Sequence, residues 1–155
     1  MFEINQSRRT IIILIGIPAS GKTTFYRRFF KGSFEHINLD TLHTRNNEQQ
    51  IIESCIADGK SFVVDNTNPA KDDRCRYIPL AKASGYHVVA VYFESKVSDC
   101  IARNANRTGK ARIPDTAVAS ISNKLELPEA SEGFDEMYFV RIENGEFIIM
   151  PWRED

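Results

Sequence analysis

The segment with the clearest chemistry covers residues 16–23, which read GIPASGKT and match the phosphate-loop pattern GxxxxGK[ST]. An apolar segment typical of a strand, Thr10–Ile15, precedes it, and a segment typical of a helix, Lys22–Phe30, begins at its end. Glycines in such a turn let successive backbone N–H groups converge, and the helix N-terminus adds the positive end of its dipole. The motif therefore predicts a site for the phosphates of a nucleotide.

Two side chains of this motif have expected roles of their own. We expect the Lys22 ammonium to reach the β- and γ-phosphates and the Thr23 hydroxyl to coordinate Mg²⁺, so ATP and Mg²⁺ are the expected cofactors. The residues expected to contact the nucleotide are Gly16, Ile17, Pro18, Ala19, Ser20, Gly21, Lys22, Thr23 and Thr24.

Two carboxylates follow other predicted strands. Asp65 comes directly after Ser61–Val64, and although such an acid is also common in turns and helix caps, beside a phosphate loop we interpret it as a support for Mg²⁺. Asp40 ends the second strand, His36–Leu39, and is either the N-cap of a helix that begins at Thr41 or a general base for an acceptor hydroxyl. Ligands collect at the carboxyl ends of parallel strands, which favours the base.

A basic segment, residues 103–112, follows a predicted amphipathic helix. Arg103 and Arg107 are four residues apart and therefore share one helix face. The segment is either a solvated basic surface or a lid that brings arginine onto a phosphoryl group during transfer. Gly109 gives the segment a place to bend.

Short apolar segments alternate with helical ones, which predicts an α/β fold with a mainly parallel sheet and helices on both faces. The expected strands are Thr10–Ile15, His36–Leu39, Ser61–Val64, His87–Phe93, Tyr138–Ile142 and Phe147–Met150. The expected helices are Lys22–Phe30, Glu48–Ala57, Pro69–Ala83, Lys96–Asn106 and one from Pro114 to about Lys124. The last two strands flank Asn144 and Gly145, which predicts a C-terminal hairpin.

Composition sets the class of protein. The 155 residues are 42% hydrophobic with a net charge of −1, so we expect one domain over residues 1–155, folded without disulfides. The three cysteines have no spacing typical of a zinc site and are expected to be small buried side chains. The longest apolar segment is too short to cross a membrane, so we expect a cytoplasmic protein with no membrane contact.

The charge is unevenly distributed along the chain. Residues 1–112 hold 17 Lys and Arg against 11 Asp and Glu, whereas residues 113–155 hold 3 against 10. A net charge near zero therefore does not exclude an anionic substrate. The sequence predicts no oligomeric state.

Several segments together resemble the kinase domain of 5′-hydroxyl polynucleotide kinases, above all the kinase half of polynucleotide kinase/phosphatases. They read GIPASGKTTF, HINLDTL, FVVDNTNP, RNANR and EGFD, and they follow in order from about Ile11 to Trp152. The resemblance implies a P-loop NTPase fold in which Lys22 and Thr23 bind ATP and Mg²⁺ and Asp40 is the general base. It also implies that Arg107, with Arg103, clamps phosphates from a lid, while Asp65 and Thr67 border the active site.

The chain departs from this family pattern in two places. Some members carry an arginine three residues after the base that holds a 3′-phosphate of the acceptor; here His43 has that place and Arg45 lies two residues further on. Whether Arg45 substitutes is open, and His43 is expected near the acceptor, whereas His36 and His87 are expected to be structural. The chain has no D-x-D-x-T phosphatase motif and is not expected to remove 3′-phosphates.

The leading functional hypothesis is ATP-dependent phosphorylation of the 5′-hydroxyl of a DNA or RNA end. The same scaffold with an aspartate base would also serve a kinase for a small molecule such as a nucleoside, a sugar or a drug. A third hypothesis is a binding module without catalysis, in which ATP orders the lid for a partner. Asp40 disfavours it, because a switch needs no base on the acceptor side.

Overall fold

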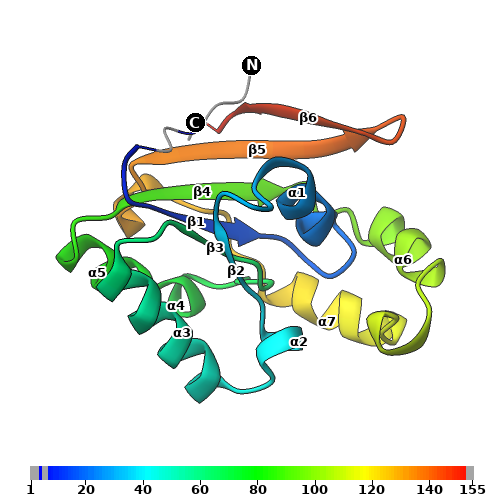
Figure 1. Ribbon diagram of the computed structural model, residues 1–155. Helices are drawn as coiled ribbons and strands as arrows, with labels where there is room; N and C mark the ends of the chain where they lie inside the picture. The colour runs from blue at the N-terminus through cyan, green and yellow to red at the C-terminus, as the bar shows by residue number, and fades with distance from the viewer. Residues whose placement is uncertain (1–3, 5–6, 153–155) are drawn as a thin grey trace.

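The computed structural model describes residues 4 and 7–152, and the predicted domain of residues 1–155 extends beyond them at both ends. A six-stranded sheet in the order β2-β3-β1-β4-β5-β6 forms its centre (Figure 1). The strands are β1 (Thr10–Ile15), β2 (Glu35–Ile37), β3 (Phe62–Val64), β4 (His87–Phe93), β5 (Glu136–Glu143) and β6 (Glu146–Pro151). Only the β5–β6 pairing is antiparallel among those described. The predicted mainly parallel α/β fold is confirmed.

Seven α-helices connect or flank the strands in the described part of the chain. They are α1 (Lys22–Phe29), α2 (Leu39–Leu42), α3 (Arg45–Asp58), α4 (Lys71–Arg74), α5 (Ile78–Ala83), α6 (Val97–Ala105) and α7 (Asp115–Lys124). Two 3₁₀ turns, Gly109–Ala111 and Ala130–Glu132, complete the regular structure. In Figure 1, α6 and α7 lie on the side of the molecule toward which the parallel strands β1 and β4 point.

The sheet is buried on both faces, which explains why its central strands are almost continuously apolar. Ile11, Ile13 and Ile15 of β1 pack on one face with side chains of α3 and α5. Ile12 and Leu14 pack on the other face with aromatic side chains of α1 and its following turn. Successive strand side chains point to opposite faces, so one uninterrupted isoleucine-rich segment supplies both cores.

The strand order places a switch point at the carboxyl end of β1. The chain runs from β1 to β2 and β3 on one side, and β4 then lies on the opposite side of β1. Open α/β sheets bind ligands at such a point, because the connections leave the strand ends in opposite directions. The phosphate-loop motif begins there, at Gly16.

The C-terminal hairpin follows its sequence signal. β5 and β6 pair with Glu143 opposite Glu146, and Asn144 and Gly145 have φ values of 52° and 76°. Positive φ at both central residues is the geometry that Asn-Gly turns favour, because it matches the twist of the two strands. The predicted hairpin is confirmed.

Three local predictions are wrong. The segment Pro69–Ala83 forms the two short helices α4 and α5, because the ring of Pro79 near the start of α5 removes a backbone donor. The second strand ends at Ile37, and residues 39–42 form α2. Cys75 is exposed, whereas Cys55 and Cys100 are buried as expected.

Across residues 4 and 7–152, no helix has the length and apolar character needed to span a bilayer.

Candidate active site

The phosphate loop is shaped by two glycines that no other residue could replace without strain. A Cβ at Gly16 would lie 2.6 Å from Ser20 Oγ and 3.0 Å from Phe93 Cβ. Gly21 has φ 102° and caps the N-terminus of α1, a conformation that side-chain-bearing residues rarely adopt. The Gly16 N–H donates to Thr67 O at 3.0 Å, which ties the loop to the segment after β3. The loop is therefore a preformed backbone cradle of the kind that phosphates need.

Lys22 is folded back over this cradle. Its Nζ donates to Gly16 O at 3.0 Å and to Ile17 O at 2.9 Å, and the residue is 8% exposed. Burial lowers the pKa of Lys22 to about 8, against a smaller opposing effect of the Asp65 carboxylate. An anion at the loop would offer this ammonium the charged partner that two backbone carbonyls do not provide.

The Asp65 carboxylate accepts a hydrogen bond from the Thr23 hydroxyl. Thr23 Oγ1 donates to Asp65 Oδ2 at 2.7 Å, so the hydroxyl lone pairs are left for a cation. His36 Nε2 lies 2.7 Å from the same oxygen and therefore carries the hydrogen. Burial alone would raise the pKa of Asp65, but the hydrogen bonds from His36 and Thr23 and the charge of Lys22 hold it below its usual value. The pair fits a magnesium site in which Thr23 is the direct ligand and Asp65 orients it.

His36 does not line the cavity but supports the site through its contact with Asp65, which agrees with the structural role predicted for it. Its ring stacks on Tyr26, with ring centroids 4.0 Å apart and planes 13° apart. The ring is thereby held in place while its Nε2 reaches Asp65. His87 lies far along the sheet on β4 and contacts Glu136 at 2.7 Å.

Asp40 lies in the first turn of α2, whose N-cap is Asn38. Asn38 Oδ1 accepts from the Asp40 N–H at 2.8 Å, so the capping alternative for the Asp40 side chain is wrong. The Asn38 amide also donates to Asp65 O at 2.9 Å. Asp40 itself is exposed and makes no side-chain hydrogen bond among the described residues. A carboxylate held on a capped turn and left unpaired is available to accept a proton.

These side chains meet in one cavity of about 310 Å³ at the carboxyl end of the sheet, which we call the active cavity. Its polar and charged lining comprises Lys22, Thr23, Asn38, Asp40, Asp65, Asn66, Thr67 and Arg107. Pro18, Ala19, Leu39, Ala111, Ile113 and Ile121 supply the apolar part. The fold therefore brings together the predicted phosphate, metal, base and lid residues. In the described part of the chain, no three His, Cys, Asp or Glu side chains form a group that could hold a metal ion.

The two lid arginines have different positions. Arg107 lines the active cavity and its Nη1 donates only weakly, to Ala111 O at 3.3 Å. Arg103 Nε donates to Ala19 O at 2.7 Å, which fastens α6 to the phosphate loop. Arg103 and Arg107 also line a second cavity of about 280 Å³ beside Thr24 and the β5–β6 hairpin. Of the two, Arg107 is the arginine that lines the cavity with Asp40 and Lys22, and Arg103 holds the loop beside it.

Of the three residues expected to contact the acceptor, only one lines the active cavity. Thr67 lines the active cavity, whereas His43 and Arg45 do not. His43 is exposed and ends α2 with φ 70°. Arg45 Nη1 donates to Glu48 Oε1 and to the Tyr77 hydroxyl, both at 2.9 Å. Their roles toward an acceptor stay predictions.

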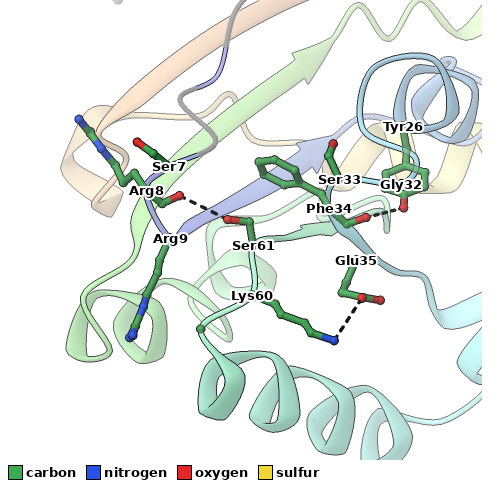
Figure 2. A pocket seen from close by; sticks show the side chains of 11 residues that line it. Ser7, Arg8, Arg9, Tyr26, Gly32, Ser33, Phe34, Glu35, Lys60 and Ser61 are labelled. Atoms are coloured by element: carbon green, nitrogen blue, oxygen red, sulfur yellow. Dashed lines mark hydrogen bonds and ion pairs between the residues drawn. The ribbon is translucent and has the colours of Figure 1, made fainter.

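A larger hollow, of about 620 Å³, lies at the opposite, amino end of the sheet. Figure 2 shows that the Arg8 and Arg9 side chains point in different directions, while Lys60 turns toward Glu35. Lys60 Nζ and Glu35 Oε1 are 3.7 Å apart, and Arg8 Nη1 lies 3.0 Å from His87 Nδ1. The cations there do not converge on one point, so this hollow lacks the arrangement of a phosphate site.

Comparison with known proteins places the chain in a family. Residues 43–128 match the family described as AAA domain. The chain belongs to this AAA domain family. A bifunctional polynucleotide phosphatase/kinase of Acanthamoeba polyphaga mimivirus is 30% identical over 145 residues, or 88% of this chain and 34% of that protein. The family match confirms the predicted P-loop kinase fold.

Two further similarities agree with this placement. The bifunctional polynucleotide phosphatase/kinase of Schizosaccharomyces pombe is 28% identical over 80% of this chain and 31% of its own length. A sugar kinase structure from Janibacter superposes with a TM-score of 0.64 and 16% identity, covering 84% of this chain and 85% of that one. The chain spans about a third of the length of the two curated relatives. The predicted resemblance to polynucleotide kinases and an ATP-dependent kinase fold are both supported.

Three residues near the site were not anticipated from the sequence. Asn38, Asn66 and Glu48 hold α2 and its surroundings through side-chain hydrogen bonds. Side chains two residues apart in an extended segment point to the same side, so the sequence could have indicated that His36 and Asn38 act together. In the structure both contact Asp65. No local pattern marks the partnership of Glu48 and Asn66, which are 18 residues apart.

Proposed function

We propose that the chain is an ATP-dependent kinase that phosphorylates the 5′-hydroxyl of a DNA or RNA end. One observation carries the proposal: the unpaired Asp40 carboxylate shares a cavity with Lys22, Thr23, Asp65 and Arg107. That set contains a phosphate-binding cation, a cation-site hydroxyl, a lid arginine and a base for an acceptor hydroxyl. The similarity to two polynucleotide phosphatase/kinases supports the choice of acceptor.

The chain's own residues divide the reaction between them. The loop N–H groups and Lys22 hold the β- and γ-phosphates, and Thr23, oriented by Asp65, would hold Mg²⁺. Bound Mg²⁺ would neutralise phosphate charge. The acceptor oxygen bonds to the γ-phosphorus as the bond to the bridging oxygen of ADP breaks, and the hydroxyl proton passes to Asp40. Arg107 stabilises the charge on the transferring group.

A small-molecule hydroxyl kinase is the second candidate. The active cavity of about 310 Å³ is at the small end of ligand sites. Arg107 is the one arginine among its described lining residues, and because it is assigned to the transferring phosphoryl group, no arginine is left there for an acceptor phosphate. The sugar kinase structure shares the fold, which carries no information on the acceptor. A binding module without catalysis would have no use for Asp40.

The test combines a variant with an acceptor series. Asp40→Asn keeps the size of the side chain but cannot take a proton, so ATP binding should persist while transfer falls by about 10²–10⁴-fold. Labelled γ-phosphate transfer to a nucleoside, a nucleoside 3′-phosphate and short 5′-hydroxyl oligonucleotides identifies the acceptor. Rising kcat/KM with added nucleotides, weakened by salt, supports the proposal. Equal performance of the bare nucleoside would favour the small-molecule kinase.

A further inference from the structure

Glu48 is a buried carboxylate that the proposed reaction does not use. It lies in the first turn of α3, is 2% exposed and is not part of the lining of the active cavity. A carboxylate removed from water is costly unless donors surround it. Its donors therefore indicate what the burial achieves.

Three side chains donate to Glu48. Arg45 Nη1 lies 2.9 Å from Oε1, and the Tyr77 hydroxyl lies 3.1 and 3.2 Å from the two oxygens. Burial, followed by the charge of Glu48, raises the pKa of Tyr77 to about 12, so the phenol keeps its proton and donates. Asn66 Nδ2 lies 2.9 Å from Oε2. Arg45 and Tyr77 neutralise and fix the carboxylate, and Asn66 is the donor that leads toward the active site.

The contact with Glu48 determines how the Asn66 amide is turned. A carboxylate only accepts hydrogen bonds, so it requires the NH₂ side of the amide. The Asn66 oxygen then faces the Leu39 N–H, at 3.0 Å. The opposite orientation would place the NH₂ group against that N–H, with two donors facing each other. Glu48, together with the Tyr77 hydroxyl oxygen at 3.2 Å from the same Nδ2, thereby selects the orientation that accepts from α2.

The first turn of α2 depends on this acceptor. The helix has four residues, too few to be stable alone, and Asp40 is its second. Two side-chain oxygens hold its first N–H groups: Asn66 Oδ1 accepts from Leu39, and Asn38 Oδ1 accepts from Asp40 at 2.8 Å. Asn38 belongs to the segment that leads into α2, whereas Asn66 follows β3 and anchors the turn to the sheet.

We propose that Glu48 is a positioning residue that acts through the Asn66 amide to hold the first turn of α2, and with it Asp40, at the active cavity. The proposal rests on the proposed role of Asp40 as base. It assigns to α3 a function in the reaction, although no α3 residue lines the cavity.

Three variants test the proposal in the whole chain. Glu48→Leu removes the acceptor and should lower kcat for phosphorylation by about 10- to 100-fold, the order expected for a catalytic group displaced by about 1 Å, with KM for ATP unchanged. Glu48→Gln keeps an oxygen that accepts from Asn66 and should recover most of that loss. Ile52→Ala, a buried apolar change in the same helix, serves as a control for general destabilisation and should lower the melting temperature without lowering kcat.

A second readout does not depend on the acceptor. Amide hydrogen exchange at Leu39, followed by NMR, should speed up in Glu48→Leu and stay near the wild-type rate in Ile52→Ala. If the wild-type protein phosphorylates no 5′-hydroxyl, the proposed function fails, while this exchange still tests the positioning. Unchanged exchange at Leu39 in Glu48→Leu, or equal kcat losses in Glu48→Leu and Ile52→Ala, would overturn the role of Glu48.

Discussion

On the phosphate side of the active cavity, one loop of eight consecutive residues, seven of which carry a backbone N–H, supplies the cradle and one buried ammonium, whereas the acceptor side is assembled from separate segments. Lys22 lies over carbonyls of its own loop, at 2.9 and 3.0 Å. Asp40 instead depends on Asn38 before α2 and on Asn66 after β3, and Asn66 depends on Glu48 of α3. The phosphate side is local in sequence, whereas the acceptor side is held by residues far apart along the chain.

This difference has a functional meaning. A backbone cradle binds any nucleoside triphosphate in the same way, so its defects should affect every acceptor equally. Side chains drawn from several segments can change one at a time, which lets the acceptor vary within one fold. Variants on the two sides should therefore differ in whether they alter the ranking of acceptors. Three predictions test this contrast.

The largest effect is expected at Arg107, which lines the active cavity with only one long hydrogen bond, 3.3 Å to Ala111 O. If it stabilises charge on the γ-phosphoryl group, Arg107→Ala should lower kcat by about 10³-fold, at the lower end of what such arginines contribute. The loss should be the same for every acceptor in a labelled-transfer assay. Arg107→Lys should recover little, because lysine lacks the planar fork.

Arg112 provides the matched control. It is exposed, lies in the same segment and is absent from the cavity lining, so Arg112→Ala should change kcat little. Similar mild losses at Arg103, Arg107 and Arg112 would instead identify the segment as a solvated basic surface. That result would remove the lid from the mechanism while leaving the phosphate loop in place.

A smaller, pH-dependent effect is expected at Lys22, whose pKa burial lowers to about 8. Nucleotide phosphates favour the charged form, so binding above this pKa must first restore the proton. Affinity should therefore fall by up to about tenfold per pH unit above pH 8, with uptake of up to about one proton. Calorimetry at pH 9 in two buffers of different ionisation enthalpy measures that uptake.

Lys22→Arg separates this lysine from other groups that titrate in the same range. An arginine stays charged throughout, so the variant should bind nucleotide, even if less tightly, without proton uptake at pH 9. Equal uptake by the two proteins would show that another group takes the proton.

The sequence predicted the phosphate side closely because its signals are local. The motif, the preceding strand and the following helix lie within residues 10–30, and β1 and β4 have the predicted bounds. The Asn-Gly hairpin was also predicted from neighbouring residues. The phosphate loop and the hairpin turn depend on backbone conformation, and a glycine in the sequence indicates that conformation directly.

The acceptor side was harder because its partners are distant along the chain. His36 looks like a strand residue until the fold brings Asp65, 29 positions away, within 2.7 Å. Glu48 looks like an acidic residue in a first helical turn, which is common without any catalytic meaning. Its burial against Tyr77 and Asn66 follows from the packing of α3 on the sheet, which no sequence pattern specifies.

The smallest effect is expected at Arg45, and it bears directly on the acceptor side. An arginine that held an acceptor 3′-phosphate would have a guanidinium free to face the cavity. Arg45 instead donates to Glu48 and Tyr77 at 2.9 Å and is absent from the cavity lining. Its side chain is 45% exposed, so solvent weakens its charge interaction with Glu48, and Glu48 keeps Tyr77 and Asn66 as donors when Arg45 is removed. Arg45→Ala should therefore lower kcat/KM slightly and equally for acceptors with and without a 3′-phosphate.

Arg76→Ala, at an exposed arginine outside the cavity lining, is the control for a lost surface charge. A selective loss with the 3′-phosphorylated acceptor would mean that Arg45 leaves Glu48 to bind substrate, and the acceptor side would then rearrange on binding rather than stand preformed like the phosphate loop.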